Sequence, residues 1–175
     1  MADGAIGENN NSGGYDSGKY DPGKYDPGRY DDPAEHDGSE KYEVDDDPAR
    51  IDRHAVCAFL SSEVYWARWR SESVIREQIR TAWRVVGVYA PDGAQVGFAR
   101  AVSDGWALAY LADVYVLPEH RGHGLGKRVV RAMIDEGPGA KFRWLLHTAD
   151  AHGLYQQFGF AQPDNTYLER PSTQA

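Results

Sequence analysis

A glycine-rich turn stands between an apolar run and a helical pattern in the stretch VYVLPEHRGHGLGKRVV, residues 114–130. The apolar run ends at a proline, and glycines then occupy positions 122, 124 and 126. Apolar residues follow at helical spacing, with Val129 and Met133 four residues apart and Val130 and Ile134 likewise. This order predicts a strand, a tight turn and a helix from about Gly124 to Glu136, which ends at Gly137-Pro138-Gly139.

A turn of this kind is suited to binding an anion. The first backbone N–H groups of a helix have no partner within it, and they lie at the positive end of the helix dipole. Glycines let this backbone approach a phosphate closely, while Arg121 and Lys127 add positive charge. Two common phosphate loops do not fit, because the ATP-type loop would need glycine at Arg121 and the dinucleotide loop would need glycine at Lys127. We therefore predict a phosphate-bearing ligand of another class.

The remaining pattern from residue 41 predicts a mixed sheet with helices on both faces. Residues 106–117 are nearly continuous in apolar character, so we expect this strand to be buried on both faces. A Pro-Asp-Gly turn joins two β-rich runs and indicates a hairpin. The predicted strands are 41–47, 83–90, 95–103, 106–117, 142–148 and 166–170, and the predicted helices are 51–60, 73–81, 124–136 and 149–159.

The first 40 residues differ in character from the rest. Tyrosines recur at positions 15, 20, 25 and 30 inside YDPGK-like units, and Pro-Gly pairs disfavour both helix and strand. We therefore predict a disordered leader over 1–40 and a folded domain over 41–175. The leader is either a solvated acidic segment or a tyrosine-rich segment for partner binding or self-association.

The net charge of −8 is uneven along the chain. Residues 1–47 carry 14 acidic and 4 basic side chains, whereas residues 48–175 have a net charge of +2. This balance argues against a general nucleic-acid-binding protein. The single cysteine, Cys57, forms no internal disulfide and no zinc site by itself, so we expect a cytoplasmic protein without a metal. The longest apolar run, WALAYLADVYVL, is too short to span a membrane, and the first residues do not read as a secretory signal.

Two sequence blocks together resemble the GNAT superfamily of N-acyltransferases. The first is R-x-x-G-x-G, residues 121–126, and the second is HTADAHGLYQQFGF, residues 147–160, which contains A-x-x-L-Y-x-x-x-G-F. The resemblance covers about residues 41–170 and implies a GNAT-like mixed, mostly antiparallel sheet. It also implies an N-acetyltransferase that takes acetyl-CoA as cosubstrate and a primary amine as acceptor.

The resemblance implies a role for most residues of the glycine-rich turn and the strand before it. Backbone amides of Val114, Tyr115 and Val116 would contact the thioester carbonyl and the pantetheine arm. The diphosphate of acetyl-CoA would be bound by a continuous run of residues: Arg121, Gly122, His123, Gly124, Leu125, Gly126 and Lys127. The N–H of His123 is a better candidate for this contact than its ring.

Acyl transfer from a thioester to an amine needs a proton donor for the thiolate and a route for the proton of the ammonium. Tyr155 is the predicted donor, since a phenol is protonated at neutral pH. The alternative is that Tyr155 is a buried helix residue that only packs on the sheet. The base is open: Ala112 stands where many members have a glutamate, Asp113 is expected on the opposite face, and His152 or a water chain would serve instead.

The acceptor would be bound by the connector after the first helix, SSEVYWARWRS, residues 61–71. Tyr65 and Trp66 are the predicted substrate-binding residues, although Trp66 and Trp69 would also suit core anchors. Two other classes of function stay open: a non-catalytic acyl-CoA sensor, and an interaction protein that acts through its leader. We expect a monomer or a homodimer.

Overall fold

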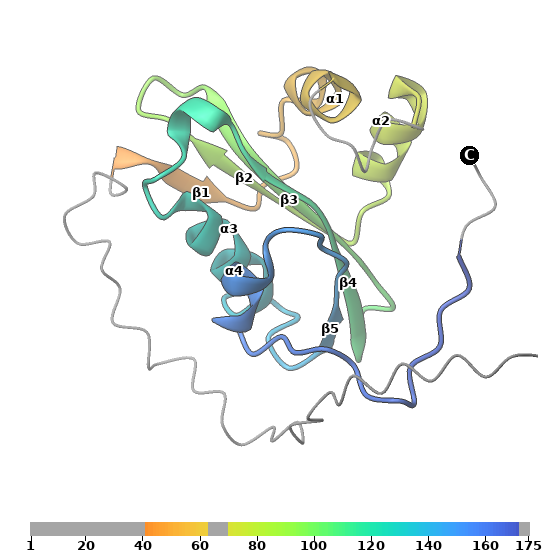
Figure 1. Ribbon diagram of the computed structural model, residues 1–175. Coiled ribbons are helices and arrows are strands. Elements are labelled where there is room, and N and C mark those ends of the chain that lie inside the picture. Colours follow the sequence, from red (N-terminus) through yellow and green to blue (C-terminus); the bar gives the residue numbers. More distant parts are fainter. Residues whose placement is uncertain (1–40, 63–69, 172–175) are drawn as a thin grey trace, which may run out of the picture.

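The computed structural model describes residues 41–62 and 70–171, which form a five-stranded sheet with helices on both faces (Figure 1). The strands lie in the order β1-β2-β3-β4-β5; the first four pair antiparallel, and β5 pairs parallel to β4. The predicted mixed, mostly antiparallel sheet is confirmed. Within the described residues, no helix is long and apolar enough to cross a membrane.

In chain order the elements are β1 (Glu43–Asp45), α1 (Arg53–Ser62), α2 (Glu72–Arg80), β2 (Arg84–Tyr89), β3 (Gln95–Ser103), β4 (Leu108–Val116), η3 (Pro118–His120), α3 (Leu125–Ile134), β5 (Arg143–Leu145) and α4 (His152–Gln156).

Helices α3 and α4 cover one face of the sheet (Figure 1). The residues of α3 that the sequence pairs at i,i+4, Val129 with Met133 and Val130 with Ile134, are all buried there. The side chain of Arg84 in β2 donates to the carbonyls of Ala132 and Met133, both at 2.7 Å, and so satisfies the C-terminal end of α3. The sheet side chains of this core are Val86, Val88, Val96, Ala99, Ala101, Leu111 and Val116.

Helices α1 and α2 cover the opposite face with a second core. The Phe59 ring of α1 stacks on Tyr115 of β4, with the ring centroids 4.0 Å apart and the planes 18° apart. Helix α2 is capped by Ser71, whose hydroxyl accepts the Val74 N–H, and it buries Ile75 and Ile79 at i,i+4. The predicted helix over 73–81 is therefore confirmed within one residue at each end.

Two sequence predictions about strands are wrong. The strand predicted over 106–117 begins at Leu108, and it is not buried on both faces at its start, where Trp106 is 86% and Leu108 43% exposed. The segment 166–170 is irregular: it follows a turn in which Asp164 accepts the N–H and the hydroxyl of Thr166, and Leu168 is 92% exposed. Its residue types favour a strand, but within the described structure it pairs with none, although β5 is the last strand of the sheet.

Candidate active site

The glycine-rich turn forms the predicted entry to a helix. Gly122 and Gly124 have positive φ angles of 87° and 65°, and Gly124 is the N-cap of α3. The carbonyl of Gly124 accepts the N–H groups of Lys127 and Arg128, which closes the first turn. Among the described residues, none accepts a hydrogen bond from the N–H of Gly122, Gly124, Leu125 or Gly126. The turn therefore presents four backbone donors at the positive end of a helix.

Gly126 has no steric reason, within the described part of the protein, to be a glycine. It lies in the first turn of α3 with ordinary helical backbone, and a Cβ there would meet only the Leu154 side chain at 3.7 Å. Inside a helix, glycine lowers the stability of the helix by about 1 kcal/mol relative to alanine. The neighbour Leu154 belongs to α4, so the two sequence blocks, far apart in the chain, lie side by side in the fold.

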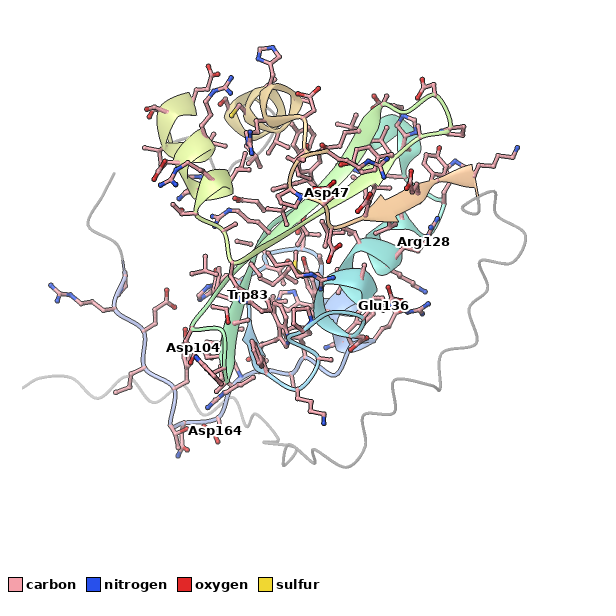
Figure 2. The ribbon with its side chains drawn as sticks, turned by 180° about the vertical axis from the view of Figure 1, so that it is seen from behind. Asp47, Trp83, Asp104, Arg128, Glu136 and Asp164 are labelled. Atoms are coloured by element: carbon pink, nitrogen blue, oxygen red, sulfur yellow. The ribbon has the colours of Figure 1, made fainter. Side chains whose placement is uncertain are left out.

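Tyr42 holds the turn against the first strand, a role that no sequence pattern indicated. Its hydroxyl hydrogen-bonds to His120 Nδ1 at 2.9 Å, and its ring lies 5.8 Å from the ring of His123. Arg128 of α3 donates to the Tyr42 carbonyl at 2.9 Å and lies on the β1 side of the helix (Figure 2). Arg121 donates through Nε to the Val116 carbonyl at 3.1 Å, which ties the turn to the end of β4.

Strands β4 and β5 separate beside the turn. Their parallel pairing joins Leu108 to Arg143 and ends with Tyr110 opposite Leu145. Beyond Tyr110, no described strand pairs with the β4 edge that contains Val114, Tyr115 and Val116, and this unpaired stretch is the gap between β4 and β5. Helix α4 follows β5 and lies beside α3 (Figure 1). The three valine-tyrosine-valine positions are thus beside the glycine-rich turn, as the sequence predicts.

The register of β4 contains a bulge at Asp113. Arg100 of β3 pairs with Ala112 and Phe98 pairs with Tyr115, so Asp113 and Val114 together oppose one residue. Asp113 has a positive φ of 53°. Its carboxylate accepts from Arg100 Nε at 2.5 Å, on the same face as Ala112. The expectation that alternation turns Asp113 to the opposite face is therefore wrong, because the bulge interrupts the alternation.

Asp113 is the centre of a buried charge cluster. Arg70, just before α2, donates to both carboxylate oxygens at 2.7 and 3.0 Å, and Arg100 adds the third hydrogen bond. Burial raises the pKa of Asp113, but the hydrogen bonds and charges of Arg70 and Arg100 outweigh burial and hold the pKa below its ordinary value. A carboxylate held ionised in this way is a poor proton acceptor. Charged residues inside two apolar strands, Arg100 and Asp113, were the sequence signal for this cluster.

Tyr155 lies in α4 with its ring in the core and in edge contact with Phe160 at 5.8 Å. In the described structure its hydroxyl has no hydrogen-bond partner, although the side chain is only 8% exposed. Burial, with smaller contributions from Asp150 and Tyr110, raises the pKa of Tyr155 to about 12. The buried packing of Tyr155 is therefore present, and no described residue forms a hydrogen bond with its hydroxyl.

The other polar candidates have different surroundings. His152 is exposed at the start of α4. The Thr148 hydroxyl accepts the Ala151 N–H at 3.0 Å, just before α4. Tyr65 and Trp66, like Trp69, lie outside the described residues, as does the leader over 1–40. No group of three or more His, Cys, Asp or Glu residues in the described ranges is arranged to hold a metal ion.

Comparison with known proteins identifies the family. The sequence model described as the acetyltransferase (GNAT) family matches residues 41–160. A solved structure from Xanthomonas campestris pv. campestris, described as a GNAT-family acetyltransferase, is 35% identical with a TM-score of 0.70, covering 75% of this chain and 93% of that one. The chain therefore belongs to the acetyltransferase (GNAT) family.

Two curated relatives carry acetyltransferase names. A protein from Gibberella zeae is 31% identical over 139 residues, which span 67% of this chain and 78% of that protein. The mycothiol acetyltransferase of Segniliparus rotundus is 37% identical over 70 residues, but these cover only 39% of this chain and 26% of that protein. The similarity to the second relative is thus local.

Proposed function

We propose that this protein is an N-acetyltransferase that transfers the acetyl group of acetyl-CoA to a primary amine by direct attack in a ternary complex. One observation carries the proposal. Four backbone N–H donors without a described acceptor lie at the start of α3, and Leu154 of α4 places the Tyr155 helix directly beside them. A diphosphate binding site and a candidate proton donor for the thiolate are therefore neighbours.

The diphosphate of acetyl-CoA would accept from the N–H groups of Gly122, Gly124, Leu125 and Gly126, and from the N–H of His123. Arg121 and Lys127 would add positive charge around it. The pantetheine arm would enter the gap between β4 and β5 and contact the backbone of Val114, Tyr115 and Val116, since β4 lacks a described strand partner there. The glycine at position 126 suits diphosphate binding, because a larger side chain there would lie between the backbone N–H groups and the diphosphate.

Tyr155 would protonate the leaving thiolate. Its raised pKa, about 12, keeps the hydroxyl protonated throughout the neutral range. A thiol has a pKa of about 8.5, so transfer of this proton to a free thiolate is uphill by roughly 5 kcal/mol. The transfer is therefore coupled to the arrival of a replacement proton from the amine nitrogen, which becomes strongly acidic as the carbon–nitrogen bond forms.

The experiment measures thiol release from acetyl-CoA with a panel of primary amines: a polyamine, an aromatic amine, free amino acids and a lysine-containing peptide. We expect turnover with at least one amine, and an approximately 100-fold lower kcat in Tyr155→Phe. Tyr89→Phe is the matched control, since Tyr89 is a buried tyrosine of β2 whose hydroxyl also has no hydrogen-bond partner in the described structure. Calorimetric binding of acetyl-CoA without turnover of any amine would instead support the acyl-CoA sensor.

We also propose that the domain continues beyond the residues matched by the family model. Residues 161–171 pass β4 and β5, where Tyr167 and Leu168 line a hollow with Leu108 and Leu145. Glu169 contacts His147 in the same region. Truncation after residue 160 is therefore expected to lower the thermal midpoint, and an unchanged midpoint would place the boundary earlier.

A further inference from the structure

Three polar side chains form a continuous hydrogen-bonded chain at the base of the gap between β4 and β5. The Tyr110 hydroxyl is 2.8 Å from His147 Nδ1, and His147 Nε2 is 3.2 Å from a carboxylate oxygen of Glu169. The three come from separate segments: β4, the residues just after β5, and the C-terminal segment. No spacing in the sequence predicts that they meet, and none of them belongs to the glycine-rich turn.

The chemistry of the three groups gives the chain a direction. An ionised carboxylate only accepts hydrogen bonds, so His147 must carry a proton on Nε2 to bond with Glu169. In a neutral imidazole the other nitrogen then has no proton, so Nδ1 accepts and the Tyr110 hydroxyl donates. The lone pairs of the Tyr110 oxygen are consequently left to accept a hydrogen bond from another donor.

The position of Tyr110 suits contact with the acceptor amine. Tyr110 is the last β4 residue paired with β5, three residues before the bulge at Asp113, and it stands opposite Val102 on the face that also carries Arg100. The charge of Tyr110 contributes to the raised pKa of Tyr155, so the two tyrosines are within electrostatic reach of each other. A hollow of about 400 Å³ lies near the start of β4, lined in part by Leu108, Leu145 and Tyr167.

We propose that Tyr110 and His147 carry a proton from the acceptor ammonium to solvent and that Glu169 positions the imidazole. This inference rests on the proposed N-acetyltransferase function. Tyr110 would be the catalytic residue that touches the amine, and His147 would receive the proton through it. The proposal fills the place of the base, for which Ala112 has no suitable group and Asp113 is held in ion pairs.

The proposed transfer moves two protons from the amine nitrogen, one to solvent and one to the sulfur. An N–H bond of the ammonium breaks and its proton moves to the Tyr110 oxygen, while the Tyr110 hydroxyl proton moves to His147 Nδ1. The imidazolium, which faces Glu169, releases one proton to water. The neutral amine then forms the carbon–nitrogen bond as the carbon–sulfur bond breaks, and a second amine proton reaches the sulfur by way of Tyr155. The products are an amide, a thiol and one proton in solvent.

Release to water is essential, because an alkyl ammonium holds its proton more tightly than an imidazole does, with reference pKa values of about 10.4 and 6.5. The His147 side chain is 55% exposed, so it can pass the proton on. The imidazole contacts Tyr110 of β4 and Glu169 of the C-terminal segment, and Tyr167 of the same segment acts on Tyr110. Burial, followed by the charges of Tyr167 and Glu169, raises the pKa of Tyr110, which keeps it a relay rather than a resident phenolate.

The kinetic test uses the full chain, acetyl-CoA and the amine of the panel with the highest kcat/KM. We expect His147→Gln to lower kcat by about 100-fold with an unchanged KM for acetyl-CoA, and to remove the rise of kcat/KM with pH near neutrality. Tyr110→Phe is expected to do the same. His54→Gln is the matched control, since His54 is exposed on α1, away from the chain of hydrogen bonds.

Two further measurements separate proton transfer from anchoring of the C-terminal segment. Added imidazole is expected to restore activity to His147→Ala at least tenfold, which a lost anchor would not allow. Nitrogen-15 spectra of the free protein are expected to show His147 as the Nε2–H tautomer, and Glu169→Gln, which keeps an acceptor but removes the charge, is expected to weaken the preference for this tautomer.

The outcomes distinguish this inference from the function on which it rests. Turnover by the wild-type chain with equal kcat and pH profile in His147→Gln overturns the relay and leaves the N-acetyltransferase intact. A His147 side chain found as the Nδ1–H tautomer also overturns it. Failure of the wild-type chain to turn over any amine refutes both.

Discussion

Replacing Asp113 by asparagine tests whether the buried charge cluster holds the bulge of β4. Asparagine tolerates the positive φ of 53° and keeps one hydrogen-bond acceptor, so the substitution removes the charge without straining the backbone. Arg70 and Arg100, with side chains only 4% and 9% exposed, would lose the carboxylate they share. Breaking a buried ion pair by removing one partner costs about 3–5 kcal/mol. Because asparagine can still accept from one arginine, we expect a loss of about 3 kcal/mol.

Urea unfolding at pH 7 measures this loss, with Glu77→Gln as the matched control. Glu77 pairs with Arg80 on the exposed face of α2, where solvent screens a salt bridge and its contribution to stability is small. The pKa of Asp113 is lowered in the folded protein, so its contribution is fully present above the unfolded value of about 3.9 and is lost as pH falls through the folded value. The difference between wild type and Asp113→Asn should therefore be constant from pH 7 to 5 and shrink only below about pH 4. A loss below about 1 kcal/mol at pH 7 would contradict the assigned role.

Two further predictions concern the core beneath α1. Phe59→Ala removes the ring that stacks on Tyr115. We expect this substitution to lower the free energy of unfolding by about 3–5 kcal/mol. A loss below about 1 kcal/mol would show that the contact contributes little to stability. Cys57 is buried, and burial raises the pKa of its thiol, so labelling by a thiol reagent at pH 8 should be slow in the native protein and fast in urea; equal rates would mean that α1 opens readily.

Local signals predicted the parts of the fold that depend on neighbours in sequence. Gly122 and Gly124 have positive φ angles, a conformation that glycine adopts more readily than other residues, so glycines at these positions indicate the turn. The spacing of apolar residues predicts α3. The cap of α2 at Ser71 is likewise a local feature. These elements were predictable because each is stabilised largely within a few residues of its own sequence.

Contacts between distant segments were not predictable in the same way. Strand alternation assigned Asp113 to the wrong face, because a bulge depends on how β3 and β4 pair and leaves no mark in the periodicity. The chain through Tyr110, His147 and Glu169 joins residues 37 and 22 positions apart. The strand predicted over 166–170 failed for a related reason, since a strand requires a partner that the sequence pattern does not specify.

The site at the start of α3 is tested most directly by a titration of coenzyme A into Gly126→Glu, measured beside wild type and Gly153→Glu. Both glycines are the second residue of a helix, and within the described part of the chain a Cβ at either has ordinary contacts or none. A carboxylate about 5 Å from a diphosphate would repel it by roughly 3 kcal/mol, about 100-fold in affinity. We predict that Gly126→Glu binds coenzyme A at least about 100-fold more weakly without a lower thermal midpoint, while Gly153→Glu binds as the wild type does. Equal affinity in Gly126→Glu would place the diphosphate elsewhere and contradict the proposed site.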